Sequence, residues 1–184
     1  MNARLRSILL TATIVTTGFA AVFISSCAED KCKALVCANG GVCNQGACIC
    51  PSGYEGPQCE TDNRTRFLNG TKSSWNVQED GSESPETQYP ISIVNGDGPT
   101  QILIKNFNNF FPEAVKARVK GDTMYIDPQT FPSGSVVGQG YIMDDKYYGV
   151  DGQMIVRYQT KDTNGIVNDY GYNPGATNVS VWTK

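Results

Sequence analysis

The chain of 184 residues carries seven cysteines, and their placement is the first chemical feature of the sequence. All seven lie between Cys27 and Cys59, and the rest of the chain contains none. Histidine is absent from the whole sequence. That absence removes the commonest general base, the Ser–His and Cys–His nucleophile pairs and the usual catalytic zinc ligands. The sequence therefore predicts no enzyme, no catalytic residue, no cofactor and no metal site.

Six of the cysteines form a compact group from Cys32 to Cys59, with the spacing C-x4-C-x5-C-x4-C-x-C-x8-C. So short a segment holds too little apolar material for a hydrophobic core, and cross-links must replace it. Six cysteines permit many pairings, and the spacing disfavours only a bond between Cys48 and Cys50. Glycines between the cysteines, such as Gly46 and Gly53, allow the tight turns that this design needs.

The stretch CANGGVCNQGACICPSGYEGPQCE resembles an EGF-like domain. The similarity lies in the N-G-G-x-C segment and in the final C-x-C-P-x-G-Y-x-G-x-x-C turn. It implies an EGF-like domain over residues 32–60. The disulfide pairing that the resemblance implies joins Cys32 with Cys43, Cys37 with Cys48, and Cys50 with Cys59.

Metal binding is the rival use of closely spaced cysteines. The absence of histidine, together with the N-terminal secretory signal described below, favours disulfides over a zinc site. Some EGF-like domains bind calcium through an acidic residue directly before the first cysteine, and Lys31 occupies that place here. Calcium is therefore not expected as a partner.

The N-terminus has the layout of a secretory signal. Arg4 and Arg6 precede an uncharged, largely apolar run that ends at Ser26. The last residues of the run, Ile24-Ser25-Ser26 before Cys27, resemble the lipobox of bacterial lipoproteins. The resemblance implies a cleaved signal peptide at 1–26, a diacylglycerol and palmitate lipid on Cys27, and a lipidated tether at 27–31. An uncleaved transmembrane anchor and a plain signal peptide that leaves Cys27 as a spare thiol remain alternatives.

The residues after Cys27 bear on location. Glu29-Asp30-Lys31 is similar to the surface-export signals of some Gram-negative lipoproteins, and Ala28 is not the aspartate that retains lipoproteins at the inner membrane in some bacteria. The resemblance implies the cell envelope, with acyl chains on Cys27 inserted in the outer membrane and the protein displayed on the surface. A short charged tether to any solvated module would look the same, so a periplasm-facing position stays open.

The last two-thirds of the chain predict a mainly β domain, after a polar linker at 61–74. Apolar and polar residues alternate in several segments separated by the turn sequences NGDG, KGD and DTNG. The predicted strands are 88–94, 100–106, 114–120, 123–126, 135–143, 153–159 and 178–184. We expect about eight antiparallel strands closed into a barrel, because an open sheet would leave exposed edges. One helical turn is expected at 111–117, beginning at Pro112.

Four segments of this region, FLNGTKSSWNV, IKNFNNF, VKGDTMYIDPQTF and GQGYI, resemble lipocalin-like, or calycin-like, β-barrels that follow EGF-like modules in some bacterial lipoproteins. The resemblance implies a lipocalin-like β-barrel domain over residues 61–184.

Aromatic residues are the candidate binding groups of this domain. Those in or near strands either fill the barrel or line a cavity for an apolar or sugar ligand. They are Trp75, Tyr89, Phe107, Phe110, Phe111, Tyr125, Phe131, Tyr141, Tyr158 and Trp182. Another set, which lies in Gly- and Asp-rich loops, gives the candidate contact residues Tyr147, Tyr148, Tyr170 and Tyr172.

The net charge of -3, without a basic cluster, argues against nucleic acid as a partner. The sequence thus predicts a membrane-anchored, extracytoplasmic lipoprotein that presents a β-barrel binding or adhesion module on an EGF-like spacer. Its partner is an unknown protein, glycan or small apolar ligand. The alternative is a carrier that sequesters a small apolar ligand inside the barrel.

Overall fold

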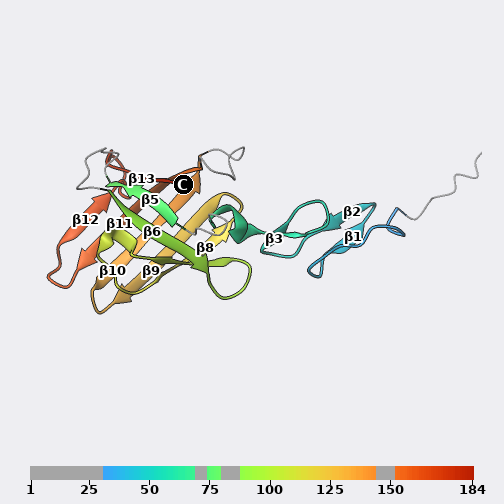
Figure 1. Cartoon of the computed structure of the whole chain (residues 1–184), viewed down its shortest axis with the longest axis horizontal. Helices are drawn as coiled ribbons and strands as arrows, with labels where there is room; N and C mark the ends of the chain where they lie inside the picture. The colour runs from blue at the N-terminus through green and yellow to red at the C-terminus, as the bar shows by residue number, and fades with distance from the viewer. Residues whose placement is uncertain (1–30, 69–73, 80–87, 144–151) are drawn as a thin grey trace, which may run out of the picture.

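The computed structural model describes residues 31–68, 74–79, 88–143 and 152–184. Two units follow each other along the chain: a small disulfide-rich unit, here called the cysteine module (residues 31–62), and a β-barrel. Figure 1 shows the cysteine module as a narrow arm that extends from one end of the barrel. No helix within these described ranges is long and apolar enough to cross a membrane.

The cysteine module is built from two short hairpins. Strand β1 (Val42–Asn44) pairs antiparallel with β2 (Ala47–Ile49). Gln45 and Gly46 connect them, both with positive φ, as a tight two-residue hairpin turn requires. The second hairpin pairs β3 (Tyr54–Glu55) with β4 (Thr61–Asp62).

The start of the predicted linker is ordered and belongs to the junction between the two units. After β4, the 3-10 helix η1 (Asn63–Arg66) carries the chain to Phe67, which is fully buried in the barrel core. The indole nitrogen of Trp75 donates a hydrogen bond to the carbonyl oxygen of Phe67 at 2.8 Å. Polar composition suggested a loose connection here, but the polar groups are used in specific contacts.

The barrel consists of eight antiparallel strands in the order β10-β9-β8-β7-β6-β5-β13-β11, and pairing of β10 with β11 closes it. Strand β12 adds to β11 outside this ring. The bounds are β5 Ser74–Gln78, β6 Gln88–Asn95, β7 Gln101–Lys105, β8 Val115–Lys120, β9 Thr123–Phe131, β10 Gly134–Ile142, β11 Gln153–Asp162, β12 Val167–Tyr170 and β13 Ser180–Thr183. The predicted fold class, a disulfide-rich module followed by a closed antiparallel barrel, is confirmed.

Some details of the strand prediction were wrong. Strands β5 and β12 fall outside the predicted segments, and β9 extends five residues beyond Ile126, to Phe131. The helical turn predicted at 111–117 is absent, since the chain is already extended from Val115. The 3-10 helix η4 (Phe107–Asn109) lies just before it, where Asn106 and Asn108 adopt left-handed backbone angles.

The barrel core is made by strict alternation along the strands. In β8, Val115, Ala117 and Val119 point inward and are buried, while the residues between them are exposed. The same period of two in neighbouring strands fills the interior with side chains, as expected for a small barrel. The largest fully buried side chains are Trp75, Trp182, Tyr158, Phe67, Phe107, Phe111, Ile91, Ile93, Ile102, Ile104, Met124 and Ile126.

Reduction of the disulfides should unfold the cysteine module and leave the barrel folded. A disulfide typically contributes about 2–4 kcal/mol by restricting the unfolded chain, whereas the barrel contains no cysteine. Both tryptophans of the chain, Trp75 and Trp182, lie in the barrel core. Their near-ultraviolet circular dichroism should therefore persist in dithiothreitol and vanish only on heating. Loss of the tryptophan signal at the reduction midpoint would contradict this prediction.

Candidate functional site

Several candidate residues fall in parts of the chain that the structure does not describe. Cys27, the predicted lipid attachment point, and the loop residues Tyr147 and Tyr148 lie outside the described residues. Lipid attachment and the contact role of these two tyrosines remain predictions from the sequence.

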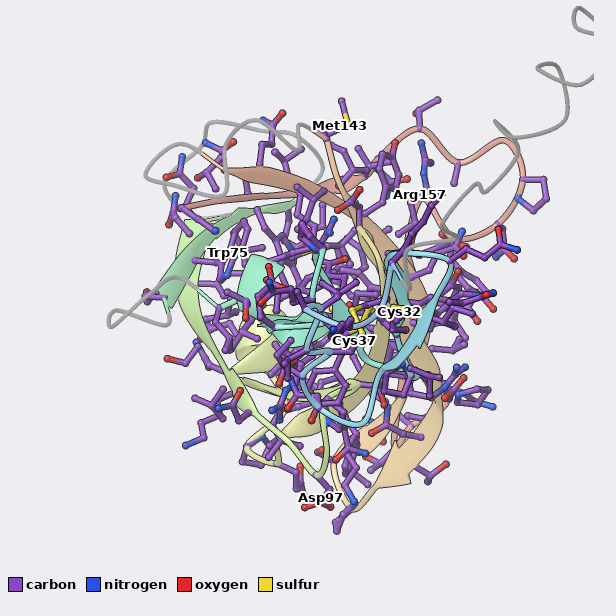
Figure 2. The ribbon with its side chains drawn as sticks, turned by 90° about the vertical axis from the view of Figure 1, so that its right-hand side faces the viewer. Cys32, Cys37, Trp75, Asp97, Met143 and Arg157 are labelled. Atoms are coloured by element: carbon purple, nitrogen blue, oxygen red, sulfur yellow. A yellow bond between two sulfur atoms is a disulfide. The ribbon has the colours of Figure 1, made fainter. Side chains whose placement is uncertain are left out.

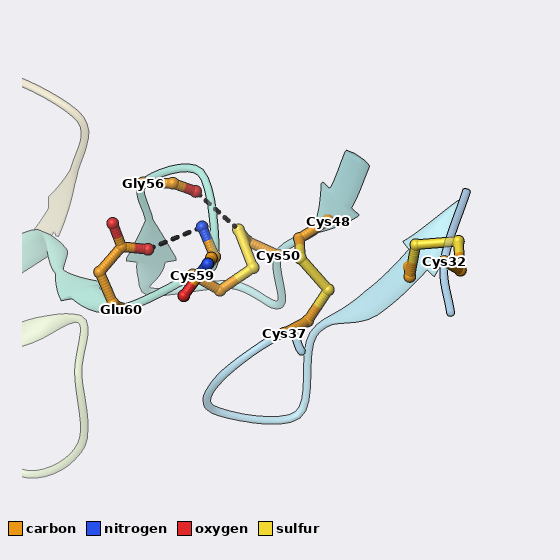
Figure 3. Close-up of a disulfide and its surroundings, with 9 residues drawn as sticks. Cys32, Cys37, Cys48, Cys50, Gly56, Cys59 and Glu60 are labelled. Carbon is orange, nitrogen blue, oxygen red and sulfur yellow. Dashed lines mark hydrogen bonds between the residues drawn. A yellow bond between two sulfur atoms is a disulfide. The ribbon is translucent and has the colours of Figure 1, made fainter. Parts of the chain in front are cut away.

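Three disulfides hold the cysteine module together (Figure 3). They join the same pairs that the EGF-like resemblance implies: Cys32–Cys43, Cys37–Cys48 and Cys50–Cys59, with Cα–Cα distances of 5.8, 5.7 and 5.2 Å. The last turn is fastened further by the backbone N–H of Gln58, which donates to Oε2 of Glu60 at 2.7 Å. The sulfur of Cys50 lies 3.6 Å from the carbonyl oxygen of Gly56, a contact without a hydrogen bond because a disulfide sulfur carries no hydrogen.

Half of the candidate strand aromatics fill the barrel. Trp75, Phe107, Phe111, Tyr158 and Trp182 are buried. Phe107 lies at the centre of this group, with its ring centroid 4.8 Å from that of Tyr158 and 5.9 Å from that of Trp182, both edge-on. Edge-to-face contact at such distances stabilises aromatic pairs beyond the area that they bury. These rings pack on one another and act as core.

The other strand aromatics lie at the edge of the core or on the outer surface. Tyr89 and Phe131 are half-buried and pack against the core. Tyr125, Tyr141 and Phe110 cannot line the interior: Tyr125 lies on the outer face beneath the guanidinium of Arg118, and the other two are 39% and 46% exposed. The alternation of β9 explains the position of Tyr125, because Met124 and Ile126 on either side take the inward places.

The sequence did not indicate a buried carboxyl group at Glu79. Glu79 is 6% exposed and follows Trp75 and Val77 at the same period of two, so it points inward. The hydroxyl of Tyr158 donates to its Oε1 at 2.6 Å, and the hydroxyl of Tyr89 donates to the same atom. The side-chain amide of Asn108 donates to the Tyr158 oxygen at 2.8 Å. Among the described residues, Oε2 of Glu79 has no hydrogen-bond partner.

Burial raises the pKa of Glu79, because removal from water penalises the charged form. Hydrogen bonds from Tyr158 and Tyr89, and the nearby Ser180 and Asn108 side chains, oppose the rise without cancelling it. Burial likewise raises the pKa of Tyr158, and the neighbouring Tyr89 and Glu79 reinforce that shift. Burial in this cluster thus disfavours the charged forms of both Glu79 and Tyr158.

The candidate contact residue Tyr170 is linked to this cluster. Its ring stacks on the ring of Tyr158, with centroids 4.4 Å apart and planes 19° apart, and the side chain is half-buried. The carbonyl oxygen of Gly171 accepts a hydrogen bond from Arg157 at 3.3 Å. Tyr170 therefore fixes the loop to the barrel and is a poor contact residue.

Tyr172 is the described loop tyrosine that faces solvent, with 41% of its surface exposed. The carboxylate of Asp169 organises the loop around it, since it accepts hydrogen bonds from the backbone N–H of Tyr172 at 2.8 Å and from the side chain of Asn173. The side-chain amide of Asn178 donates to the Asp169 carbonyl oxygen at 2.7 Å. An exposed aromatic on a preordered loop is suited to contact a partner.

The described cavities lie on the outside of the molecule. One, of about 360 Å³, lies between the cysteine module and the barrel. Two others, of about 220 and 240 Å³, lie against the outer faces of β8–β9 and of β9–β11. In the part of the chain that the structure describes, no group of three or more His, Cys, Asp or Glu residues is placed to hold a metal ion. What the arrangement offers is surface for binding.

Replacement of Glu79 by glutamine should flatten the pH dependence of barrel stability. Because the folded-state pKa of Glu79 is raised, its contribution to stability is present below the usual value of 4.5 and is lost as pH rises through the folded-state pKa. The wild-type free energy of unfolding should therefore fall, relative to Glu79→Gln, as pH rises above 4.5. Urea unfolding at several pH values measures this difference. Parallel pH profiles of Glu79→Gln and wild type would refute the raised pKa of Glu79.

Comparison with known proteins identifies one part of the chain. No solved structure matches the chain. Residues 27–59 match the family model of the EGF-like domain, a range that contains all three disulfides of the cysteine module. The cysteine module is therefore an EGF-like module, and it is followed by a closed eight-stranded antiparallel barrel.

Proposed function

We propose that the protein is an extracytoplasmic lipoprotein, anchored in the outer membrane through acyl chains on Cys27, that presents its β-barrel as a binding or adhesion module on the EGF-like cysteine module. The proposal joins the lipobox-like sequence before Cys27 to the two-unit architecture. It assigns no catalytic step to the protein, and it leaves the partner as a protein or a glycan on the outside of the membrane.

Contacts at the junction support the role of the cysteine module as a spacer. The guanidinium of Arg66 forms ion pairs with Glu55 in the cysteine module and with Asp122 in the turn between β8 and β9. Arg64 pairs with Asp62 and donates to the carbonyl oxygen of Gly96, between β6 and β7, at 3.1 Å. These contacts involve only partly exposed groups. They connect η1, which follows the module, both to the module and to two separate turns of the barrel. A spacer held in this way keeps the barrel at a defined distance from the anchor.

The observation that carries the binding proposal is the filled interior of the barrel. Phe107, Tyr158 and Trp182 occupy its centre, and the described cavities lie outside. A carrier needs an open cavity of about 300 Å³ or more lined by apolar side chains. This packing favours recognition at the outer surface over transport of an enclosed ligand, and it leaves Tyr172 as a suitable contact group.

Replacement of Cys27 by alanine should remove the lipid and release the protein from the membrane. The thiol is the attachment atom, so intact-mass measurement should show loss of the acyl mass, and the protein should move to the soluble fraction. Ser26→Ala is the matched control, because it keeps a small residue before the cysteine and should keep the lipid. An unchanged membrane fraction for Cys27→Ala would overturn the anchoring proposal.

Truncation of the exposed loop aromatic should weaken partner binding. A screen of glycans and host proteins with the soluble fragment 30–184 would identify a partner, and Tyr172→Ala should then reduce its affinity by about tenfold, the effect of losing a buried aromatic contact. Tyr141→Ala is the control, because Tyr141 is exposed to a similar extent (39% against 41%) but lies on β10. Equal loss in both variants would argue against a specific role for the loop.

A further inference from the structure

The cavity between the cysteine module and the barrel, here called the junction hollow, has a volume of about 360 Å³. Residues 50–54 of the cysteine module form one side, Thr100 and residues 118–120 of the barrel form the other, and Asn63 lies between them in the chain. The volume falls within the range of about 300–1,000 Å³ that is usual for small-molecule sites. Both units contribute walls, so neither makes this hollow alone.

The two walls meet at a fixed distance. Gly53 has a φ of +95°, and a β-carbon at this position would come within 2.7 Å of Cγ of Pro99 and 2.9 Å of Cγ2 of Thr100. The turn between β6 and β7 that carries these residues, with Asp97 near its tip, extends to the rim of the barrel in Figure 2. The backbone N–H of Val119 donates to the carbonyl oxygen of Thr100 at 2.8 Å and ties the barrel side together. A hollow already shaped in the free protein loses little entropy when a ligand enters.

Asn63 belongs to the lining of the junction hollow. Its side chain is 92% buried (8% exposed), and its Oδ1 has no hydrogen-bond partner among the described residues. The backbone N–H of Asn63 donates to the carbonyl oxygen of Gly53 at 2.9 Å, which fixes the residue in place. A buried amide oxygen without a donor destabilises the fold. Because this oxygen is enclosed by the protein, a ligand in the hollow does not reach it.

Lys120 gives the hollow an uncompensated positive charge. Arg118 is engaged by Asp127, which accepts from its Nε at 2.6 Å and from its Nη2 at 2.7 Å. Lys120 is exposed and forms no ion pair within the described part of the chain. An ammonium group without a partner at the edge of a hollow favours a ligand with a carboxylate.

The remaining lining suits a sugar. The half-buried Tyr54 lines the hollow together with Ser52 and Thr100. An aromatic residue and two residues with hydroxyl groups are thus available to the apolar face and the hydroxyl groups of a pyranose. A sugar ring presents both an apolar C–H face and hydrogen-bonding hydroxyl groups. An apolar ligand would leave the charge of Lys120 without a partner.

We propose that the junction hollow binds a sugar unit that carries a carboxylate. Lys120 pairs with the carboxylate, the side chains of Ser52 and Thr100 hydrogen-bond to ring hydroxyls, and Tyr54 packs against the apolar face of the ring. The inference rests on the binding part of the proposed function and is independent of lipid attachment at Cys27.

The test is titration of the purified full-length chain, in detergent micelles, with glucuronate and with glucose as the neutral comparison. Glucuronate should bind more tightly than glucose, and added salt should weaken its binding. Lys120→Ala should lower the affinity for glucuronate by about tenfold, as expected for loss of a charged hydrogen bond. The matched control is Lys116→Ala, which removes the same charge from the same strand outside the hollow and should have no effect.

Asn63→Asp is the second variant, because it keeps the side-chain shape and adds a negative charge. It should lower glucuronate affinity, with thermal unfolding monitored to verify the fold. Absence of glucuronate binding, equal binding of glucose, or wild-type affinity in Lys120→Ala would each overturn the inference. If Tyr172→Ala abolishes binding of the screened partner while Lys120→Ala leaves glucuronate affinity unchanged, the proposed binding function is supported and the sugar site in the junction hollow is refuted. Retention of Cys27→Ala in the membrane would instead overturn the anchoring alone.

Discussion

The connection from Asp62 to Phe67 is the constraint on which the arrangement of the molecule depends. Phe67 is buried in the barrel core, while Arg66, its neighbour in the chain, reaches back to Glu55 and across to Asp122. The segment that follows the cysteine module is therefore held in place by contacts with the barrel. Because a single short segment sets both the entry into the core and the ion pairs, the distance between the two walls of the junction hollow follows from it.

A second dependence runs through the barrel interior. Glu79 is the one glutamate or aspartate among the buried described residues, and it accepts hydrogen bonds from tyrosines of β6 and β11. The ring of Tyr158 stacks on the ring of Tyr170, so the position of Tyr158 also fixes that of Tyr170. Tyr170 comes directly before the loop on which Tyr172 is exposed. A buried carboxyl oxygen that accepts hydrogen bonds from two side chains restricts how these neighbours can be arranged, as Oε1 of Glu79 does here. The surface loop is thus positioned from inside.

The sequence predicted the features whose signals are local. Cysteine spacing and alternation of apolar residues act over a few positions, and they indicated the cysteine module and most of the strands. The ion pair of Arg66 with Asp122 joins residues 56 positions apart, so no local pattern indicates it. Glu79 was missed because strand β5 before it was not predicted and because a carboxyl group is rarely placed in a core. The inward or outward direction of Tyr125 was ambiguous, since Met124 and Ile126 beside it are apolar as well.

Closure of the barrel also affects how the protein folds. Strand β13, the last of the ring in chain order, lies between β5, the first, and β11, and Trp182 of β13 pairs with Val77 of β5 and Met154 of β11. Contacts of such long sequence separation must form before the core is shielded, and proteins rich in them fold slowly. During synthesis, every strand from β5 to β11 emerges while both edges of the sheet are still unpaired. The nascent chain is then exposed to aggregation, and a chaperone would need to protect it until β13 arrives.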